Sequence, residues 1–402
     1  MVSRMRRRVR LPARVRALKP FFAMEIMERA QQLEAQGRHI VHLEIGEPDF
    51  DTPSCIKEAC VHVLLEKRPQ YTHSMGLLEL REAICEHYER RYRVKVTPDR
   101  VLVTSGTSPA MLLACSVLLA RGNKVILSDP HYACYPNFVR YAGGDPCFVE
   151  VQEEEGFQFN LDRVRSTVSK KVKAVVVNSP SNPTGTLTSP EVLAGLSDLG
   201  MYVVSDEIYH GLVYDGQKEH TILEFTDDAF VLNGFSKLHA MTGWRLGFLI
   251  GPPSFMRGLQ ILHQNFFISA NSFVQWAGLT ALREADADIE KMKAMYNERR
   301  IVLLKGLRTL GFRIAVEPTG AFYVLANARH FDTDSKRLAY DILEGAGVGC
   351  TPGIDFGRNA EGYLRFTYAN STEHIEEALS RMKTYLERRA EEGRRGAPHI
   401  FG

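Results

Sequence analysis

The sequence predicts an α/β protein with a large domain, in which helices sandwich a mostly parallel sheet, and a smaller α+β domain. Short runs rich in β-branched residues alternate with longer helical stretches, which is typical of a parallel sheet covered on both faces. The chain has 402 residues, 45% of them hydrophobic, which suits two domains with an ample core. Polar residues and glycines follow several of the apolar runs, where the loops of an α/β sheet form a ligand-binding crevice.

Six short apolar runs predict the strands of the large sheet in chain order. They are residues 101–104, 124–127, 174–178, 202–205, 230–233 and 246–250. A helical stretch over 273–308 then leads into a second unit, with strands near 313–316 and 321–324. We therefore expect five parts. They are an arginine-rich disordered arm (1–18), the first part of the smaller domain (19–50), the large domain (51–285), the rest of the smaller domain (286–392) and a tail (393–402).

Charge is unevenly distributed along the chain. The net charge is only +2, yet the first sixteen residues hold seven arginines and no acid. Such an arm is more often a solvated tail than a nucleic-acid ligand, and no apolar run of signal-peptide length follows it. We therefore expect no nucleic-acid partner.

The cysteines and the apolar segments bear on the cellular compartment. Seven cysteines are scattered without a Cys-x-x-Cys pair, so the pattern indicates neither a disulfide framework nor a zinc site. The longest apolar stretch, over 110–120, is too short to span a bilayer. The histidines form no His-Glu-x-x-His motif. These features favour a cytoplasmic protein with reduced thiols, no membrane segment and no catalytic metal.

The segment 234–247 carries the strongest chemical signal. Lys237 lies among small and apolar residues, where a lysine loses its proton readily and forms a Schiff base with a carbonyl. Arg245 follows eight residues later and offers a fork that matches a phosphate. The apolar run before Asp206 places a carboxylate at the end of a predicted strand, although Asp206 alone equally suits a helix cap.

A glycine loop precedes the apolar helix that we expect to begin near Pro109. Gly106 lets the backbone approach a ligand closely, while Thr107 and Ser108 supply amides and a hydroxyl. Helix N-termini present unpaired amides and the positive end of the helix dipole, which suits a phosphate. By itself this loop is more often a plain helix cap; together with Lys237 and Arg245 it indicates a phosphate site.

The order and spacing of these motifs resemble the class I aminotransferases, relatives of aspartate aminotransferase. The resemblance covers most of the chain, from the Gly-Glu-Pro-Asp-Phe sequence at 46–50, through Tyr71 and the Asn-Pro-Thr-Gly sequence at 182–185, to 362–369. Several motifs in the family's order are much more specific than any one alone. The resemblance implies the type I fold of pyridoxal-phosphate transferases and ping-pong transfer of an amino group between an L-amino acid and a 2-oxo acid.

The resemblance also assigns roles to individual residues around pyridoxal 5′-phosphate. Lys237 forms the Schiff base with the cofactor and moves the proton, and Asp206 pairs with the ring nitrogen. Asn182 and Tyr209 bond the ring's phenolic oxygen, and Tyr132 stacks on the ring. The phosphate ligands it implies are Gly106, Thr107, Ser108, Ser236, Arg245 and, from the neighbouring subunit, Tyr71. The match therefore implies a homodimer with shared active sites.

For the substrate, the resemblance assigns the α-carboxylate to Arg365, assisted by Asn182 and by the backbone near Gly46. One departure is Gly234, where some members carry a phosphate-binding serine, and Ser236 is the candidate to replace it. The segment 19–25, which passes the substrate side chain in relatives, is mainly apolar here. It favours apolar or aromatic amino acids over aspartate, or else Phe21 and Phe22 simply pack the smaller domain.

Two other functions fit much of this pattern. A pyridoxal-phosphate-dependent carbon–sulfur β-lyase uses the same cofactor and residues, and differs in releasing pyruvate and ammonia without an acceptor. A regulatory protein built on an aminotransferase-like domain needs an N-terminal DNA-binding module, and only about twenty residues precede the matching region, too few for a helix-turn-helix domain.

Overall fold

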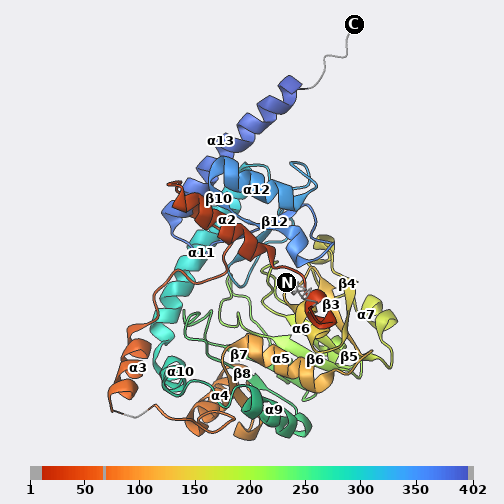
Figure 1. The fold of residues 1–402 in the computed structure, drawn as a ribbon, viewed down its shortest axis with the longest axis vertical. Helices are drawn as coiled ribbons and strands as arrows, with labels where there is room; N and C mark the ends of the chain where they lie inside the picture. Colours follow the sequence, from red (N-terminus) through yellow and green to blue (C-terminus); the bar gives the residue numbers. More distant parts are fainter. Residues whose placement is uncertain (1–10, 67–68, 397–402) are drawn as a thin grey trace, which may run out of the picture.

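The computed structural model describes residues 11–66 and 69–396. A seven-stranded sheet forms the centre of the large unit, in the order β2-β8-β7-β6-β5-β3-β4 (Figure 1). Its strands are β2 (Val101–Thr104), β3 (Lys124–Asp129), β4 (Asp145–Glu150), β5 (Val172–Asn178), β6 (Tyr202–Asp206), β7 (Ala229–Gly234) and β8 (Gly247–Ile250). Strand β8 pairs antiparallel with both neighbours, and the other pairings are parallel. The predicted α/β class with a mostly parallel sheet is confirmed.

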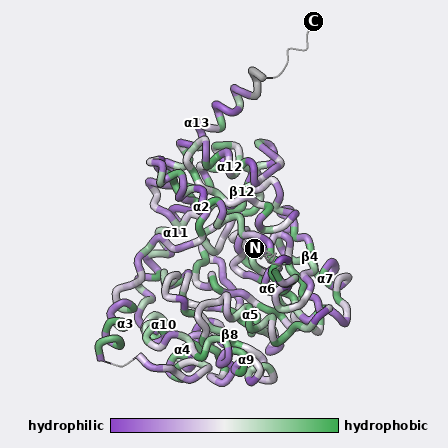
Figure 2. The backbone as a smooth tube through the Cα atoms, viewed as in Figure 1, coloured by the Kyte–Doolittle hydropathy of each residue, from purple (hydrophilic) through white to green (hydrophobic). Residues whose placement is uncertain are grey.

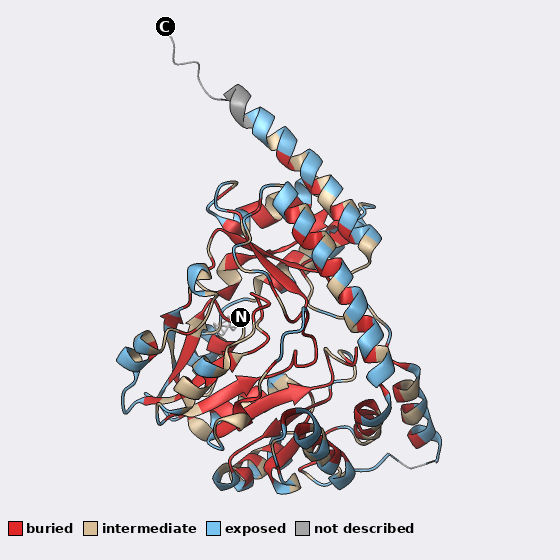
Figure 3. Cartoon of the chain, turned by 180° about the vertical axis from the view of Figure 1, so that it is seen from behind, coloured by how far each residue is buried: buried red, intermediate tan, exposed pale blue. Residues whose placement is uncertain are grey.

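The strands of this sheet are buried because helices cover both of its faces. Residues of β2, β7 and β8 are buried without exception, and the strands stand out as buried in Figure 3. The larger covering helices are α3 (Ser54–Glu66), α4 (Leu78–Tyr92), α5 (Thr107–Leu118), α6 (Tyr135–Tyr141), α7 (Leu161–Thr167), α8 (Pro190–Ser197), α9 (Pro253–Phe266) and α10 (Ser272–Glu284). No helix among residues 11–66 and 69–396 is both long and apolar enough to cross a membrane.

A second, smaller unit contains two further sheets. Strand β1 (Val41–His42) pairs parallel with β10 (Val348–Gly349), and β12 (Tyr363–Thr367) pairs antiparallel with β9 (Tyr323–Asn327) and β11 (Thr351–Pro352). The helices α2 (Phe22–Ala35), α12 (Ser335–Ala346) and α13 (Thr372–Gly396) pack around these strands, and α11 (Asp286–Thr309) runs between the two units (Figure 1). Residues from both ends of the described chain thus build this unit.

Several predicted elements differ from the structure. The helical stretch predicted over 273–308 is two helices that meet at Ala285. No strand forms over 313–316, where Arg313 makes only an isolated bridge to Asn327, and the strand predicted at 321–324 begins at Tyr323 instead. Strand β4 was not predicted, because it is a half-exposed edge strand that contains a proline and little hydrophobic pattern.

The ends of the chain also differ from expectation. Disorder is wrong for Ala13–Arg16, which form the short helix α1 against α6; residues 1–10 lie outside the described residues. Helix α13 continues past residue 392, where the tail was predicted to begin, to Gly396. All seven cysteines are free thiols.

Candidate active site

A cavity of about 340 Å³ lies between the large sheet and the smaller unit. It opens at the carboxyl ends of the parallel strands, where α/β sheets bind ligands. All predicted site residues except Gly106 and Tyr71 line it. The residues from the prediction are Gly46, Thr107, Ser108, Tyr132, Asn182, Asp206, Tyr209, Ser236, Lys237, Arg245 and Arg365. Chain folding therefore brings together residues that are more than 300 positions apart.

Lys237 lies in the turn after β7, and its amine points into the cavity. Its Nζ donates a hydrogen bond to the carbonyl of Gly46 at 2.5 Å. Burial lowers the pKa of Lys237 to about 8, helped by the positive charges of Arg365 and Arg245, while the carboxylates of Glu47 and Asp206 oppose that change. About a tenth of the amine is therefore neutral and nucleophilic at pH 7, far more than for a lysine with its usual pKa.

Asp206 ends β6, and its carboxylate is buried beneath the cavity. It accepts hydrogen bonds from the Tyr135 hydroxyl at 2.7 Å and from the Ile208 amide at 3.3 Å. Burial raises the pKa of Asp206 to about 6, although both hydrogen bonds favour the charged form. A buried carboxylate in this position suits a cationic partner, because an opposite charge restores its ionised form.

An anion site is built where α5 begins. The helix begins at Thr107, two residues before the predicted position, so the amides of Thr107 and Ser108 belong to its first turn. Gly106, the N-cap, has φ +93°, and a Cβ there would lie 2.7 Å from Nη2 of Arg245. Arg245 is itself held with φ 56° and donates to the Thr242 carbonyl at 2.9 Å. A guanidinium beside a helix N-terminus fits a phosphate.

Arg365, on β12, is buried between aromatic rings. Its guanidinium carbon lies 4.5 Å from the ring centre of Tyr323 and 4.9 Å from that of Phe356. Nη1 donates to Oδ1 of Asn182 at 2.9 Å, whereas Nη2 donates to the Glu44 carbonyl at 2.5 Å. Its buried Nε has no hydrogen-bond partner among the described residues, which is rare for a buried donor. A guanidinium with donor capacity left over is suited to a carboxylate ligand.

The neighbouring polar residues link the two units across the cavity. The hydroxyls of Tyr209, after β6, and Tyr323, on β9, are 2.8 Å apart. Gly46 is tightly packed here, because a Cβ would lie 1.9 Å from the Tyr323 hydroxyl. Burial raises the pKa of Tyr209 well above its usual value, so this phenol stays protonated and can donate a hydrogen bond.

One wall of the cavity is apolar. It includes Phe21, Ala23, Met24 and Ile208, and the ring of Phe21 stands edge-on to that of Tyr132, with centroids 6.1 Å apart. Both ends of the segment 19–24 are fixed. The Lys19 amide and carbonyl each bond the side chain of Asn137 at 3.0 Å, and two amides at the start of α2 donate to Asp355. The apolar side chains at 21–24 thus face a site as well as the protein core.

Four residues of the site were missed in the sequence. Tyr135 binds Asp206, Tyr323 binds Tyr209, and Thr242 donates to the Glu47 carboxylate beside the lysine. Tyr135 was detectable, because it lies three residues after Tyr132 in the same aromatic motif. Glu47 and Thr242 lie in the motifs at 46–50 and 234–247, but nothing in those motifs shows that folding pairs them, and Tyr323 had no signal. Tyr71, by contrast, was predicted and does not line the cavity; its side chain is 82% exposed.

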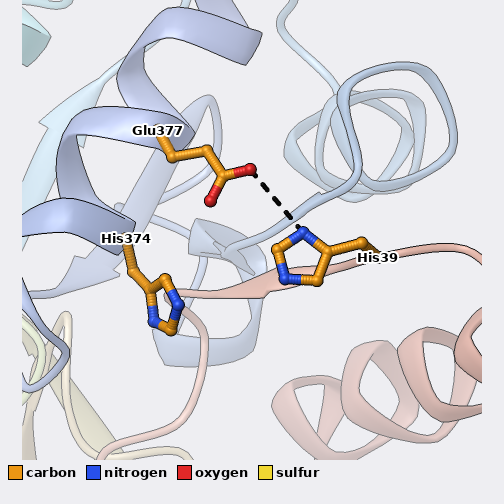
Figure 4. Close-up of side chains that lie close together, drawn as sticks. All are labelled: His39, His374 and Glu377. Atoms are coloured by element: carbon orange, nitrogen blue, oxygen red, sulfur yellow. Dashed lines mark ion pairs between the residues drawn. The ribbon is translucent and has the colours of Figure 1, made fainter.

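One cluster of potential metal ligands lies outside the cavity. Among the described residues, His39, His374 and Glu377 have ligand atoms within 4.8 Å of one another (Figure 4). Two of these ligand atoms are already engaged, because Nη2 of Arg381 donates to Nδ1 of His39 at 2.6 Å and to Oε1 of Glu377 at 2.5 Å. The guanidinium supplies positive charge where an ion would bind, and none of the three residues lines the cavity.

Comparison with known proteins gives consistent results. The family described as "Aminotransferase class I and II" matches residues 38–382. The aspartate/prephenate aminotransferase of Thermus thermophilus is 39% identical over 385 residues, which cover 94% of this chain and 99% of that protein.

Two solved structures extend the comparison. The Thermus thermophilus aspartate aminotransferase with maleate has a TM-score of 0.90 at 38% identity, covering 94% of this chain and all of the other. A Methanococcus jannaschii protein, described as similar in its active site to kynurenine aminotransferases, has a TM-score of 0.87 at 38% identity, with the same coverage.

Proposed function

Because this chain belongs to the class I and II aminotransferase family and is a transaminase, we propose that it works with pyridoxal 5′-phosphate in the cavity described above. One observation carries the proposal. A buried amine with a lowered pKa, a buried carboxylate and a guanidinium at a helix N-terminus, from Lys237, Asp206 and Arg245, line the same cavity. These are the three groups that the cofactor's aldehyde, ring nitrogen and phosphate require.

When bound, pyridoxal 5′-phosphate supplies an aldehyde and a ring that withdraws electrons from the substrate's α-carbon. Asp206 provides the negative charge for the ring nitrogen, and Tyr135 orients that carboxylate. Asn182 and Tyr209 would hydrogen-bond the phenolic oxygen, and Tyr132 would stack on the face of the ring. The phosphate would be bound by Gly106, Thr107, Ser108, Ser236 and Arg245. Gly106 leaves room for the guanidinium of Arg245 because it has no Cβ.

Lys237 has two tasks in this proposal. Its Nζ holds the cofactor before substrate binds and afterwards accepts the proton from the substrate's α-carbon. A pKa of about 8 suits both tasks, because a general base works best when its pKa is near the operating pH. Burial and the two arginines lower the pKa of Lys237, and the carboxylate of Glu47 raises it.

The substrate carboxylate belongs to Arg365, assisted by Asn182 and by the backbone near Gly46. Asn182 already accepts from Nη1, and the aromatic rings of Tyr323 and Phe356 limit the movement of the guanidinium. A bidentate pair with a carboxylate positions as well as binds, so Arg365 sets the direction in which the α-carbon faces Lys237.

We assign the side-chain preference to apolar or aromatic amino acids. Phe21, Met24 and Ile208 form the apolar wall, and the only cationic side chains among the described lining residues are Lys237, Arg245 and Arg365, each with a task already. The likeness to a protein compared with kynurenine aminotransferases supports an aromatic substrate, whereas the aspartate/prephenate relative makes the dicarboxylate the competitor to test.

A homodimer in the cytoplasm completes the proposal. Tyr71 is too exposed to serve its own subunit's cavity, which supports a role at the phosphate of a second copy. Three exposed apolar side chains, Val61, Leu64 and Leu65, belong to α3, the helix that precedes Tyr71 in the chain. Helix α3 lies at the edge of the molecule in Figure 2. Such a surface favours contact with another protein.

The test is a spectrum of the protein with pyridoxal phosphate, followed by a panel of L-amino acids with 2-oxoglutarate or pyruvate as acceptor. We expect a visible band that an amino acid bleaches and a 2-oxo acid restores, with phenylalanine or tyrosine more effective than aspartate. Lys237→Ala should abolish turnover and change the band, and Lys218→Ala, an exposed lysine, should do neither.

Three results would contradict parts of this proposal. Absence of a band would remove the cofactor assignment. Release of pyruvate and ammonia without an acceptor would replace transamination by carbon–sulfur cleavage. Aspartate as the best donor would overturn the apolar preference and leave the rest intact.

A further inference from the structure

A short loop of the smaller unit, residues 353–359, is hydrogen-bonded to the end of β3 in the large sheet. The carboxylate of Asp129 accepts the backbone N–H of Asn359 at 3.1 Å and that of Arg358 at 3.2 Å. In return, Nδ2 of Asn359 donates to the Asp129 carbonyl at 3.1 Å and to the Val151 carbonyl at 2.7 Å. Asp129 is buried, yet it does not line the active-site cavity.

The fit of this loop on β3 is close. A Cβ on Gly357, which has φ +127°, would lie 2.0 Å from Oδ1 of Asp129. The amide of His131 also donates to the Phe356 carbonyl at 2.8 Å. The contact leaves no room for a side chain at 357, and the hydrogen bonds tie residues 356–359 to the position of Asp129.

Two side chains of the same loop contact residues that line the active site. The ring of Phe356 is fully buried and lies 4.9 Å from the guanidinium carbon of Arg365. Asp355 accepts the amides of Phe22 and Ala23 at 3.0 and 3.1 Å, which fixes the first turn of α2 and the apolar wall. The loop thus touches both the carboxylate site and the side-chain pocket.

We propose that Asp129 is a positioning residue that holds the loop 353–359. Through Phe356 and Asp355, this loop would position Arg365 and the apolar wall so that both contact the same substrate molecule. The inference rests on the proposed carboxylate role of Arg365. It accounts for a carboxylate at 129, since each of its two oxygens accepts one of the two N–H donors. An asparagine would turn an amide NH₂ toward one of these donors and push the loop away.

The test measures Asp129→Asn as the holoenzyme. Binding of 3-phenylpropanoate, a carboxylate without an amino group, is titrated by calorimetry, and steady-state kinetics are recorded for the amino acid and the 2-oxo acid. We expect binding to weaken about tenfold and both KM values to rise by a similar factor, with kcat changed less than about twofold. The cofactor band should keep its position, because Asp129 touches none of the proposed cofactor ligands.

A purely structural role would give another result. Glu219→Gln is the matched control, since Glu219 is a buried carboxylate of the large unit that bonds Arg91 at 2.5 Å, away from the cavity. It should lower Tm and leave 3-phenylpropanoate binding unchanged. If Asp129→Asn behaves in the same way, the proposal is wrong. If Asp129→Asn does not fold, Asn359→Ala, which removes only the two Nδ2 bonds, takes its place with the same expected weakening.

A double-mutant cycle tests the path. Phe356→Leu removes the ring beside Arg365 and should also weaken 3-phenylpropanoate binding. If Asp129 acts through Phe356, the double variant binds about as weakly as Phe356→Leu alone, whereas additive losses would overturn the proposed path. Arg365→Lys separates the two proposals. Unchanged binding in Arg365→Lys would refute the carboxylate assignment itself, but a loss there with none in Asp129→Asn would refute this inference only.

Discussion

At the scale of single residues, the chemistry depends on groups whose charge the cavity alters. Lys237 has a pKa of about 8 and Asp206 one of about 6, and burial is the main cause of both shifts. Burial acts in opposite directions because it disfavours the ion in each case, a cation for lysine and an anion for aspartate. A bound cofactor that carries positive charge on its ring would favour ionised Asp206 again.

The pKa of Lys237 predicts how the cofactor-free protein takes up pyridoxal phosphate. Below about pH 8 the amine is protonated and cannot attack an aldehyde, so the uptake rate should rise about tenfold per pH unit and level off above that value. Stopped-flow absorbance measures the profile. Glu47→Gln removes a carboxylate that raises this pKa, so its profile should move to lower pH. A shift to higher pH would contradict this account of the electrostatics.

At the scale of elements, short strands rely on side-chain pairs at their ends. His42 is the last residue of β1. Its Nδ1 lies 2.7 Å from Oε1 of Glu44, and its Nε2 lies 3.1 Å from Oε1 of Glu34. The hydrogen bond to Glu44 is the largest cause that raises the pKa of His42, to about 9, against the opposing effect of burial. The Glu44 carbonyl in turn accepts from Arg365, so this pair lies directly behind the substrate site.

The raised pKa gives His42 a pH-dependent contribution to stability. The folded protein holds this proton more tightly than the unfolded chain, whose histidine has a pKa of 6.5. The stabilisation is fully present below about pH 6.5 and is lost as pH rises through about 9. His42→Gln should therefore lower the free energy of unfolding at about pH 6 and change it little at about pH 10, as measured by denaturant titration.

A matched histidine gives the control for this experiment. His62, exposed on α3, faces Glu66 at 3.4 Å across one helical turn. Exposed pairs contribute little, so His62→Gln should change the free energy of unfolding only slightly at both pH values. An equal loss for His42→Gln at the two pH values would show that its effect comes from packing and not from the proton.

At the scale of the whole molecule, the cavity depends on two units and, in our proposal, on two subunits. Lys237, Asp206 and Arg245 come from the large unit, whereas Gly46, Tyr323 and Arg365 come from the smaller one. Tyr71, 82% exposed, has no place in its own cavity. A shared active site requires that each subunit complete the other, which is a property that mixed dimers reveal.

Hybrid dimers provide the prediction. Lys237→Ala and Tyr71→Ala homodimers should each be nearly inactive at limiting cofactor. If Tyr71 serves the partner's phosphate, a hybrid of the two variants contains one site with both native residues and one with neither. An equal mixture, unfolded and refolded together, should recover about a quarter of native activity, because half of the dimers are hybrid and each has one working site. No recovery would place Tyr71 in its own subunit's site.

The sequence by itself determined the α/β class and six of the seven large-sheet strands, and it singled out half of the residues that line the cavity. Each is recorded locally: strands as apolar runs, and Lys237, Asp206 and Arg245 as motifs at fixed spacings. Only tertiary structure decided the rest. The contacts that Tyr323, Glu47 and Asp129 make have no local signal, because their partners at Tyr209, Thr242 and Asn359 are over 100 residues away. Burial, which shifts the pKa of Lys237 and Asp206, is likewise a property of the packed chain, since it depends on atoms that folding brings together.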